Sequence, residues 1–529
     1  MLSFLLVSLS IDAILGEMTV HQRRKKLEGM TKGDGLGDAY AATLSRIKAQ
    51  HRSRSILGMQ VLMWVSHSER PLRVEELCHA LGVEEGSTDL NTQNIPAREA
   101  LIACCLGLIM VEKSSSTVRL VHYTLQEYLS RDSNLFLNSH STIAEVCLTY
   151  LSFREVRSIS STLHSVPPTV PFVEYASCYW GAHARRETTE SVKNLAVKLL
   201  DGFDKHISSK VLLLHEMGIW GRRFDRGDSS WGFTGLHGAA YFGCVEITVA
   251  LLGIGKWDTR TTDCHGNTAI AWAVRRGHEE AARILLDRNE VHPNTTDEYG
   301  RTLLSCAAQN GHEGVVRILL ERNDVNPNTA SKYGETPLSR AAENGHEDVV
   351  RLLLERNDVN PDTADKYGQT PLWRAAQNGY EKVMRMLLER RDINPDVADT
   401  LFGQTPLSQA AENGHEGVVR MLLERNDVNP NAADILLGQT PLSRAALNGH
   451  DGVVRLLAER DDVNPEKPEN CGQALVSRAA QDGHEKIPKL LRRRIDPISR
   501  YTASSQSTEL FIPKPSDLSE PLPKRIRRS

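Results

Sequence analysis

The chain has 529 residues, of which 25% are charged and 5% aromatic, and its formal net charge is −4 at pH 7. This length predicts more than one domain, and the balanced charge excludes a global basic field that would recruit nucleic acid. The nine cysteines are scattered without any C-x-x-C pair. This pattern argues against a zinc site or a disulfide framework and favours a reducing, cytoplasmic compartment.

The first residues, MLSFLLVSLSIDAIL, form an apolar run. No Lys or Arg precedes the run and Asp12 interrupts it, which is not typical of a signal peptide. The run is also too short to span a membrane. We interpret it as a buried helix and expect no membrane partner, although these features do not exclude a membrane signal.

Residues 55–135 read as helix, turn, helix, helix, strand and helix, which is compatible with a winged-helix unit. In such a unit the recognition helix would lie around Pro96 to Cys105, where the charged side chains are Arg98 and Glu99. DNA-reading helices place several Arg, Lys, Asn or Gln side chains there. A winged helix that packs against protein is therefore favoured over one that contacts DNA.

A repeat dominates the second half of the chain. Glycine recurs at steps of 34 or 35 residues, at Gly243, Gly277, Gly311, Gly345, Gly379, Gly414, Gly449 and Gly483. A fixed period in this range predicts a solenoid of helical units, here about eight of them. Each unit buries its apolar surface against its neighbours, so the stability of the array is a sum of unit and interface terms.

One unit illustrates the local reading. Thr336 is a good N-cap and Pro337 suits the first position of a short helix. Gly345 ends that helix cheaply in the left-handed conformation. A second helix starts near His346 and carries Val349, Val350, Leu352, Leu353 and Leu354, which neighbouring units are expected to cover. A polar loop of turn-forming residues follows.

Histidines recur at the start of the second helix, each followed by Glu or Asp, at His278, His312, His346, His415, His450 and His484. Catalysis requires unlike groups that converge in one pocket, whereas these pairs are spread along a rod. We interpret them as structural and expect no enzyme activity, no cofactor and no metal. The NDVNPD loops lack the spacing of an EF-hand, so we interpret them as polar turns.

The pattern G-x-TPL-x-x-AA-x-NGH-x-x-VV-x-LLL resembles the ankyrin repeat over about half of the chain. The position after TPL is usually His in that family, but here it is Ser339, Trp373, Ser408 and Ser443. The resemblance implies a mainly α fold, in which an ankyrin solenoid follows a helical and winged-helix-like region. It also implies a concave surface lined by the loops and the first helices.

On that surface we predict a protein-binding row consisting of Arg340, Trp373, Arg374, Gln409, Arg444 and Arg478. Arg and Trp often dominate the energy of interfaces, and the excess of arginines predicts an acidic segment in the partner protein. In the alternative reading, the arginines are solvated or pair with neighbours such as Glu343, and Trp373 fills a gap between units.

The segments VLMWVSHSERPLRVEELCHAL, VRLVHYTLQEYL and PFVEYASCYWGAHARR look like those that follow the ATPase module in fungal STAND-type NACHT proteins. Many such proteins end in ankyrin repeats. The resemblance divides the chain into residues 1–54 (end of the ATPase module and linker), 55–135 (winged helix), 136–228 (helical arm), 229–495 (ankyrin repeats) and 496–529 (disordered basic tail). A phosphate loop, G-x-x-x-x-G-K-[ST], is missing from the sequence.

We therefore predict a non-enzymatic protein-interaction protein with a truncated STAND-type regulatory region. The alternatives are a nuclear transcriptional regulator whose winged helix contacts DNA, and the C-terminal part of an ATP-driven receptor. The tail ends in PLPKRIRRS, a basic cluster that leaves nuclear import open. Nucleic acid is otherwise not a favoured partner, and the sequence does not address small molecules.

Overall fold

The computed structural model describes residues 19–22, 24, 35–131, 135–159, 166–216, 232–288, 290–464, 484 and 486–491. It divides into two compact units, residues 1–337 and 338–529. The expected fold class is confirmed, because helix pairs repeat along the chain after a winged-helix-like region. None of the described helices is long and apolar enough to cross a membrane. The predictions for residues 1–15, Arg478 and the tail after residue 495 lie outside the described residues.

The winged-helix-like region combines a helical core with a two-stranded antiparallel sheet, in which Met110 pairs with Arg119. Its elements are α3 (Gly35–Lys48), α4 (Arg52–His67), α5 (Val74–Leu81), η1 (Thr92–Asn94), α6 (Arg98–Cys104), β1 (Ile109–Val111), β2 (Val118–Leu120) and α7 (Tyr123–Arg131). A Cβ on Gly58 of α4 would lie 2.8 Å from the backbone oxygen of Cys104. Only glycine therefore lets α4 and α6 pack this closely.

The start of α5 is fixed by a buried carboxylate. Glu76 accepts a hydrogen bond from the Arg73 backbone N–H at 2.7 Å and pairs with the Arg70 guanidinium at 2.8 Å. Burial opposes its ionisation, but these hydrogen bonds and the Arg70 charge hold the pKa of Glu76 below its usual value. The helix thus begins where the sequence places an acidic residue near its N-terminus.

The helical arm packs against the first repeat of the same unit. It consists of α8 (Ser139–Ser152), α9 (Arg154–Arg157), α10 (Val173–Arg186), α11 (Glu190–Leu200), η2 (Phe203–Lys205) and α12 (Ile207–Glu216). Helices α10 and α11 pack against α13 (Gly235–Phe242) of that repeat. A Cβ on Gly235 would lie 2.2 Å from the Leu200 backbone oxygen, and a Cβ on Gly181 2.1 Å from the Phe242 ring.

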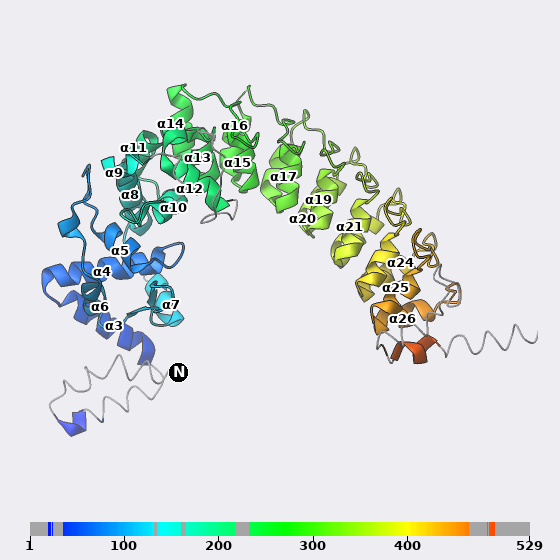
Figure 1. The fold of residues 1–529 in the computed structure, drawn as a ribbon, viewed down its shortest axis with the longest axis horizontal. Coiled ribbons are helices and arrows are strands. Elements are labelled where there is room, and N and C mark those ends of the chain that lie inside the picture. Colours follow the sequence, from blue (N-terminus) through cyan, green and yellow to red (C-terminus); the bar gives the residue numbers. More distant parts are fainter. Residues whose placement is uncertain are drawn as a thin grey trace, which may run out of the picture. The chain divides into compact units, whose positions relative to one another are not determined.

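The repeats are pairs of short antiparallel helices stacked along each unit (Figure 1). The first unit contains α13, α14 (Val245–Ile254), α15 (Ala269–Arg275), α16 (Glu279–Leu286), α17 (Leu303–Asn310) and α18 (Glu313–Leu320). The remaining pairs are α19 (Pro337–Glu343) with α20 (Glu347–Leu354), α21 (Pro371–Asn378) with α22 (Glu381–Leu388), α23 (Pro406–Glu412) with α24 (Glu416–Leu423), and α25 (Pro441–Leu447) with α26 (Asp451–Ala458). Most of the eighth expected unit lies outside the described residues.

The caps of the first helices follow the sequence reading. Thr370 accepts the Trp373 backbone N–H at 3.2 Å, and Pro371 occupies the first turn. Gly379 ends the helix at φ +75°, and a Cβ there would lie 2.5 Å from Nδ1 of His415 in the next repeat. The glycine is therefore required both by its backbone conformation and by the ring that packs on it.

Successive loops are linked by a side chain that follows the Asn-Pro dipeptide. Where this residue is Asn431, its amide donates to the Asp462 backbone oxygen at 2.6 Å and its oxygen accepts the Asn464 N–H at 2.8 Å. Asp362 and Asp396 occupy the same place in other repeats, but in each the buried Oδ1 finds no partner. Burial raises the pKa of both carboxyl groups.

Replacing Asp362 and Asp396 by Asn should therefore stabilise the protein by about 1 kcal/mol per site at neutral pH, because the amide supplies the missing donor. The gain should shrink as the pH falls, since a protonated carboxyl group with a raised pKa regains a hydrogen to donate. Urea unfolding of the double variant at two pH values measures both effects. The reverse change, Asn431→Asp, is the matched control and should destabilise; stabilisation by Asn431→Asp would contradict the explanation.

A histidine cluster around the buried His183 joins the winged helix to the arm. Nδ1 of His183 lies 2.8 Å from Nδ1 of His140, and its Nε2 lies 2.9 Å from the Tyr175 hydroxyl. The His67 ring packs edge-on against the His140 ring. Burial, with the charges of His140 and Arg186, lowers the pKa of His183 to about 3. Burial also lowers the pKa of His67 and His140, so all three rings favour the neutral form in the folded protein.

We expect the first unit to lose stability in mild acid. The unfolded chain protonates His183 near pH 6.5, whereas the folded chain resists protonation down to about pH 3. Stability is thus complete above pH 6.5 and falls by about 2 kcal/mol by pH 5 through this residue alone. Thermal unfolding followed by the fluorescence of the buried Trp64 and Trp180 tests this. His183→Gln, which cannot titrate, should flatten the pH dependence; an unchanged slope would rule out His183 as the cause.

Candidate functional site

Three successive loops of the second unit are each organised by one aspartate. Oδ1 of Asp365 accepts the backbone N–H groups of Tyr367 at 2.8 Å and Gln369 at 2.9 Å. Asp399 and Asp434 close the next two loops in the same way. All three carboxylates are buried. The sequence analysis treated these loops only as polar turns, whereas each is a fixed hairpin built around an acidic side chain.

The arginines of the predicted binding row hold these loops. Arg374 donates to Asp365 Oδ2 and to Glu343 Oε1, both at 2.8 Å. Arg444 makes the equivalent pair with Asp434 at 2.8 Å and also contacts Glu412. Arg340 pairs with Glu343 at 2.9 Å. Arg374 and Arg444 therefore each bridge two acidic groups of the array, and Arg340 is paired with Glu343.

The row is consequently not an open basic strip. The side chains of Arg340, Arg374 and Arg444 are only 11–19% exposed. Gln409 is buried and its amide contacts that of Gln404. The structure thus resembles the alternative reading, in which the arginines pair with neighbours such as Glu343. Whether a partner also contacts these residues, Arg478 included, stays a prediction.

Sequence reasoning missed a second surface, at the tips of the hairpin loops of the second unit. Six large apolar side chains there are 42–64% exposed, namely Tyr367, Leu401, Phe402, Ile435, Leu436 and Leu437. We call these six residues the apolar strip. The sequence did contain a signal for these longer loops. The two repeats whose glycines are 35 rather than 34 residues apart are the ones that contain the longer tips 399–403 and 434–438.

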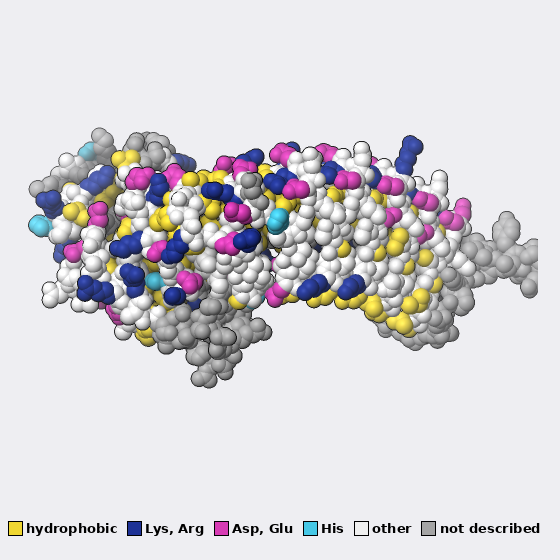
Figure 2. All heavy atoms as spheres, turned by 90° about the horizontal axis from the view of Figure 1, so that it is seen from above, with side chains coloured by type: hydrophobic (Ala, Val, Ile, Leu, Met, Phe, Trp, Pro, Cys, Tyr) yellow, Lys and Arg dark blue, Asp and Glu magenta, His cyan; other side chains and the backbone are white. Residues whose placement is uncertain are grey.

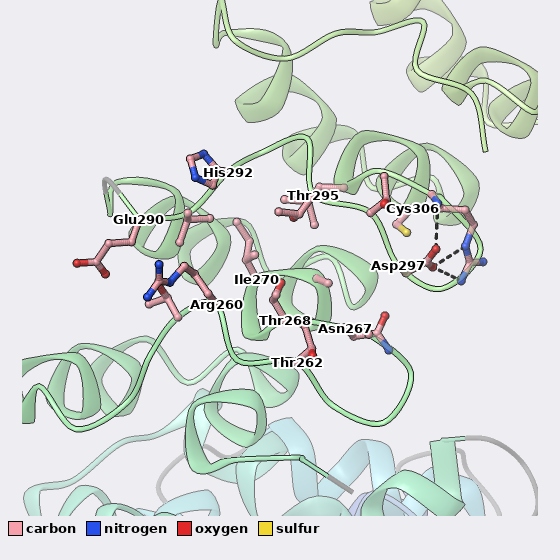
Figure 3. Close-up of a pocket in the computed structure, with 17 residues that line it drawn as sticks. Arg260, Thr262, Asn267, Thr268, Ile270, Glu290, His292, Thr295, Asp297 and Cys306 are labelled. Atoms are coloured by element: carbon pink, nitrogen blue, oxygen red, sulfur yellow. Dashed lines mark hydrogen bonds and ion pairs between the residues drawn. The ribbon is translucent and has the colours of Figure 1, made fainter. Parts of the chain in front are cut away.

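A cavity of about 240 Å³ lies between two loops of the first unit (Figure 3). Its lining includes Thr259, Thr268 and Ile270, and the two threonine hydroxyls are buried without a partner. Thr268 stands at the N-cap of α15 but its side chain does not cap the helix. Among the charged lining residues, Arg260 pairs with Asp258 and Arg301 pairs with Asp297. The two unpaired hydroxyls offer an ordered water polar partners in this otherwise mostly apolar space, and the lining brings together no pair of nucleophile and base.

A family model described as ankyrin repeats matches residues 236–329, 322–399, 357–434 and 407–501. Together these matches cover half of the chain. The chain belongs to the ankyrin-repeat family. Its array of ankyrin repeats therefore includes the eighth unit, which is mostly outside the described residues. A second family model, described as the winged helix domain of GPI inositol-deacylase, matches residues 44–144. The prediction of a winged helix is thereby confirmed, and the link to fungal STAND proteins stays a prediction.

Solved structures include a similar array, the ankyrin repeat domain of Bcl-3, described as a unique member of the IkappaB protein family. It is 24% identical, the match covers 39% of this chain and 91% of that chain, and the TM-score is 0.35. A likeness at this level carries no functional argument. Comparison with curated proteins gives no match.

Trp373 occupies the ankyrin position that usually carries His. Its indole N–H donates to the Gln404 backbone oxygen of the following loop at 2.8 Å, and the ring is buried. In the first ankyrin repeat His237 occupies the same position and bonds the Asn267 backbone oxygen at 3.1 Å. Trp373 therefore replaces a structural histidine. The buried ring and its bond to the next loop give Trp373 a packing role, as in the alternative reading of the sequence.

The recurring histidines at the second helices also have structural contacts. Nε2 of His415 lies 3.0 Å from the Gln377 backbone oxygen, and Nε2 of His450 lies 2.8 Å from that of Glu412. Each ring thus bonds the end of the first helix in the preceding ankyrin repeat. Among the described residues, no group of three or more His, Cys, Asp or Glu side chains is arranged to hold a metal ion.

Proposed function

We propose that this chain is a non-enzymatic protein-interaction protein. Its ankyrin array binds a partner protein, and residues 1–228 form a regulatory region of the STAND/NACHT type. Membership of the ankyrin-repeat family supports the first part, and the winged-helix match supports the second. An acidic segment in the partner remains part of the proposal.

One observation carries the proposal, namely the exposed apolar strip on loops whose backbone is fixed. Large apolar side chains gathered on an exposed surface mark interaction sites. Because Asp365, Asp399 and Asp434 already order these loops, little conformational entropy remains to be lost when a partner binds. The loops therefore have the properties of a preorganised binding surface.

We also propose that the protein works in the cytoplasm and without a cofactor. The eight described cysteines form no disulfide with one another, and all but Cys264 are buried. Free, buried thiols suit a reducing compartment. Burial raises the pKa of Cys178 and Cys244, which keeps these thiols protonated and chemically inert.

Cross-linking of the full chain in a lysate of its source, followed by mass spectrometry, tests the proposal. We expect one protein in near-stoichiometric amount, with cross-links to lysines of the ankyrin loops such as Lys332 and Lys366. Cross-links confined to residues 1–228 would contradict it. A gel shift with the full chain and duplex DNA addresses the alternative, and a shift at physiological salt would favour a DNA-contacting regulator.

A further inference from the structure

The longer hairpin tips contain an extra residue that the turn itself does not need. The tip Asp365–Gly368 closes with two residues between Asp and Gly, whereas 399–403 and 434–438 have three. In both forms the aspartate accepts N–H groups of the tip at 2.7–3.1 Å. The added length supplies only exposed apolar side chains, and the strip grows from one to two to three of them along the array.

Such a surface is costly in water unless something covers it. Hydrophobic side chains gather along the lower edge of the right-hand part of the surface in Figure 2. The tips do not move independently, because Thr400 N–H donates to Tyr367 O and Ile435 N–H donates to Phe402 O, both at 2.8 Å. The apolar strip is therefore a row of three fixed loop tips, which belong to three successive loops of the array.

We propose that the apolar strip docks one amphipathic helix of the partner protein, which lies along the array. This inference rests on the proposed function and names the chemistry of its partner. Stacked helices stand about 8–10 Å apart, and two turns of an α-helix rise about 10.5 Å. Apolar residues repeated every seven positions of a helix thus meet successive tips.

Charge sets the direction of the docked helix. Lys366, next to Tyr367, is exposed and has no ion-pair partner among the described residues, whereas residues 400–402 and 435–437 are uncharged. The end of the helix near Lys366 therefore carries acidic residues. A single lysine is too little charge for an anionic bilayer, which is recognised by clusters of basic residues. A partner helix is accordingly favoured over a membrane.

The test uses the full chain and a labelled helical peptide of about 18 residues, with leucines at heptad spacing and glutamates at one end. Fluorescence anisotropy should show saturable binding. The triple variant Phe402→Ser, Ile435→Ser, Leu437→Ser should weaken it by about tenfold or more, and Lys366→Glu by about three- to fivefold. The matched control is Val249→Ser with Ile254→Ser on α14, which removes exposed apolar side chains elsewhere and should change nothing.

Equal binding by the wild-type chain and the triple variant would overturn the inference, as would equal binding of a peptide with the same leucines scattered around the helix. Absence of binding would overturn it too. Two further measurements identify other occupants. If the wild-type chain sediments with phosphatidylserine vesicles and the triple variant does not, the strip binds a membrane instead of a helix. If the wild-type chain self-associates in the ultracentrifuge and the triple variant does not, the strip binds a second copy of the chain. If the triple variant still cross-links to the same protein in lysate, the apolar strip is not the docking site, but the proposed protein-binding function stands.

Discussion

Replacing Leu353 by Ala should lower the free energy of unfolding by about 2–5 kcal/mol. Leu353 lies on α20 and is completely buried in the stack. Removing its outer carbons leaves a cavity that the short helices on either side cannot close without moving whole repeats. Because each repeat is stabilised by its neighbours, the effect should extend beyond the altered repeat.

Urea unfolding followed by circular dichroism measures this change. The neighbouring Leu354→Ala is the matched control, because Leu354 is only partly buried although the sequence analysis placed it on the covered face. Its substitution should cost clearly less. Equal losses for the two variants would show that the buried face of α20 has been assigned wrongly.

Reversing the charge of Arg444 should also destabilise the protein, by about 3–5 kcal/mol. Arg444→Glu removes the only cation bonded to the buried carboxylate of Asp434 in the described structure, and adds a third acidic group beside Glu412. An uncompensated buried charge is the main cost. The sequence-based view of Arg444 as an open binding residue predicts an unchanged melting temperature instead.

The control for this variant is Arg455→Glu on α26 of the same repeat, where the side chain is exposed. It should change the melting temperature very little. If Arg444→Glu unfolds at the same temperature as wild type, the ion pair with Asp434 does not organise the loop. The arginine row would then again be a candidate contact surface.

Much of the fold follows from local chemistry. Thr370 before Pro371 marks the start of a helix, and Gly379 marks its end. The spacing of Val349, Val350 and Leu353 identifies the covered face of α20. These signals act over a few residues, so the sequence alone reveals them. The glycine period further predicts that the units stack in chain order, because each unit buries its apolar surface against the next one.

The site could not be predicted in the same way. One ion-pair partner of Arg374 is Glu343, which lies 31 positions earlier in the chain. The two residues become neighbours only because successive repeats stack on one another. The role of Trp373 likewise depends on a backbone oxygen in the following loop. The longer loop tips were visible as glycine steps of 35 residues, but their exposure depends on how Asp399 and Asp434 fold the turns.

The glycines at the junction between the arm and the first ankyrin repeat limit how this array can evolve. Internal repeats are interchangeable modules, since each presents similar faces to both sides, and unequal recombination can add or remove them. The first repeat is different, because Gly235 lies against Leu200 at a position where internal repeats carry a side chain, as at Ala269, Leu303 and Pro371. A duplicated internal module placed there would collide with the arm. Repeats can therefore be gained or lost only downstream of Gly235. Each such change alters the length of the surface that the array offers to partners.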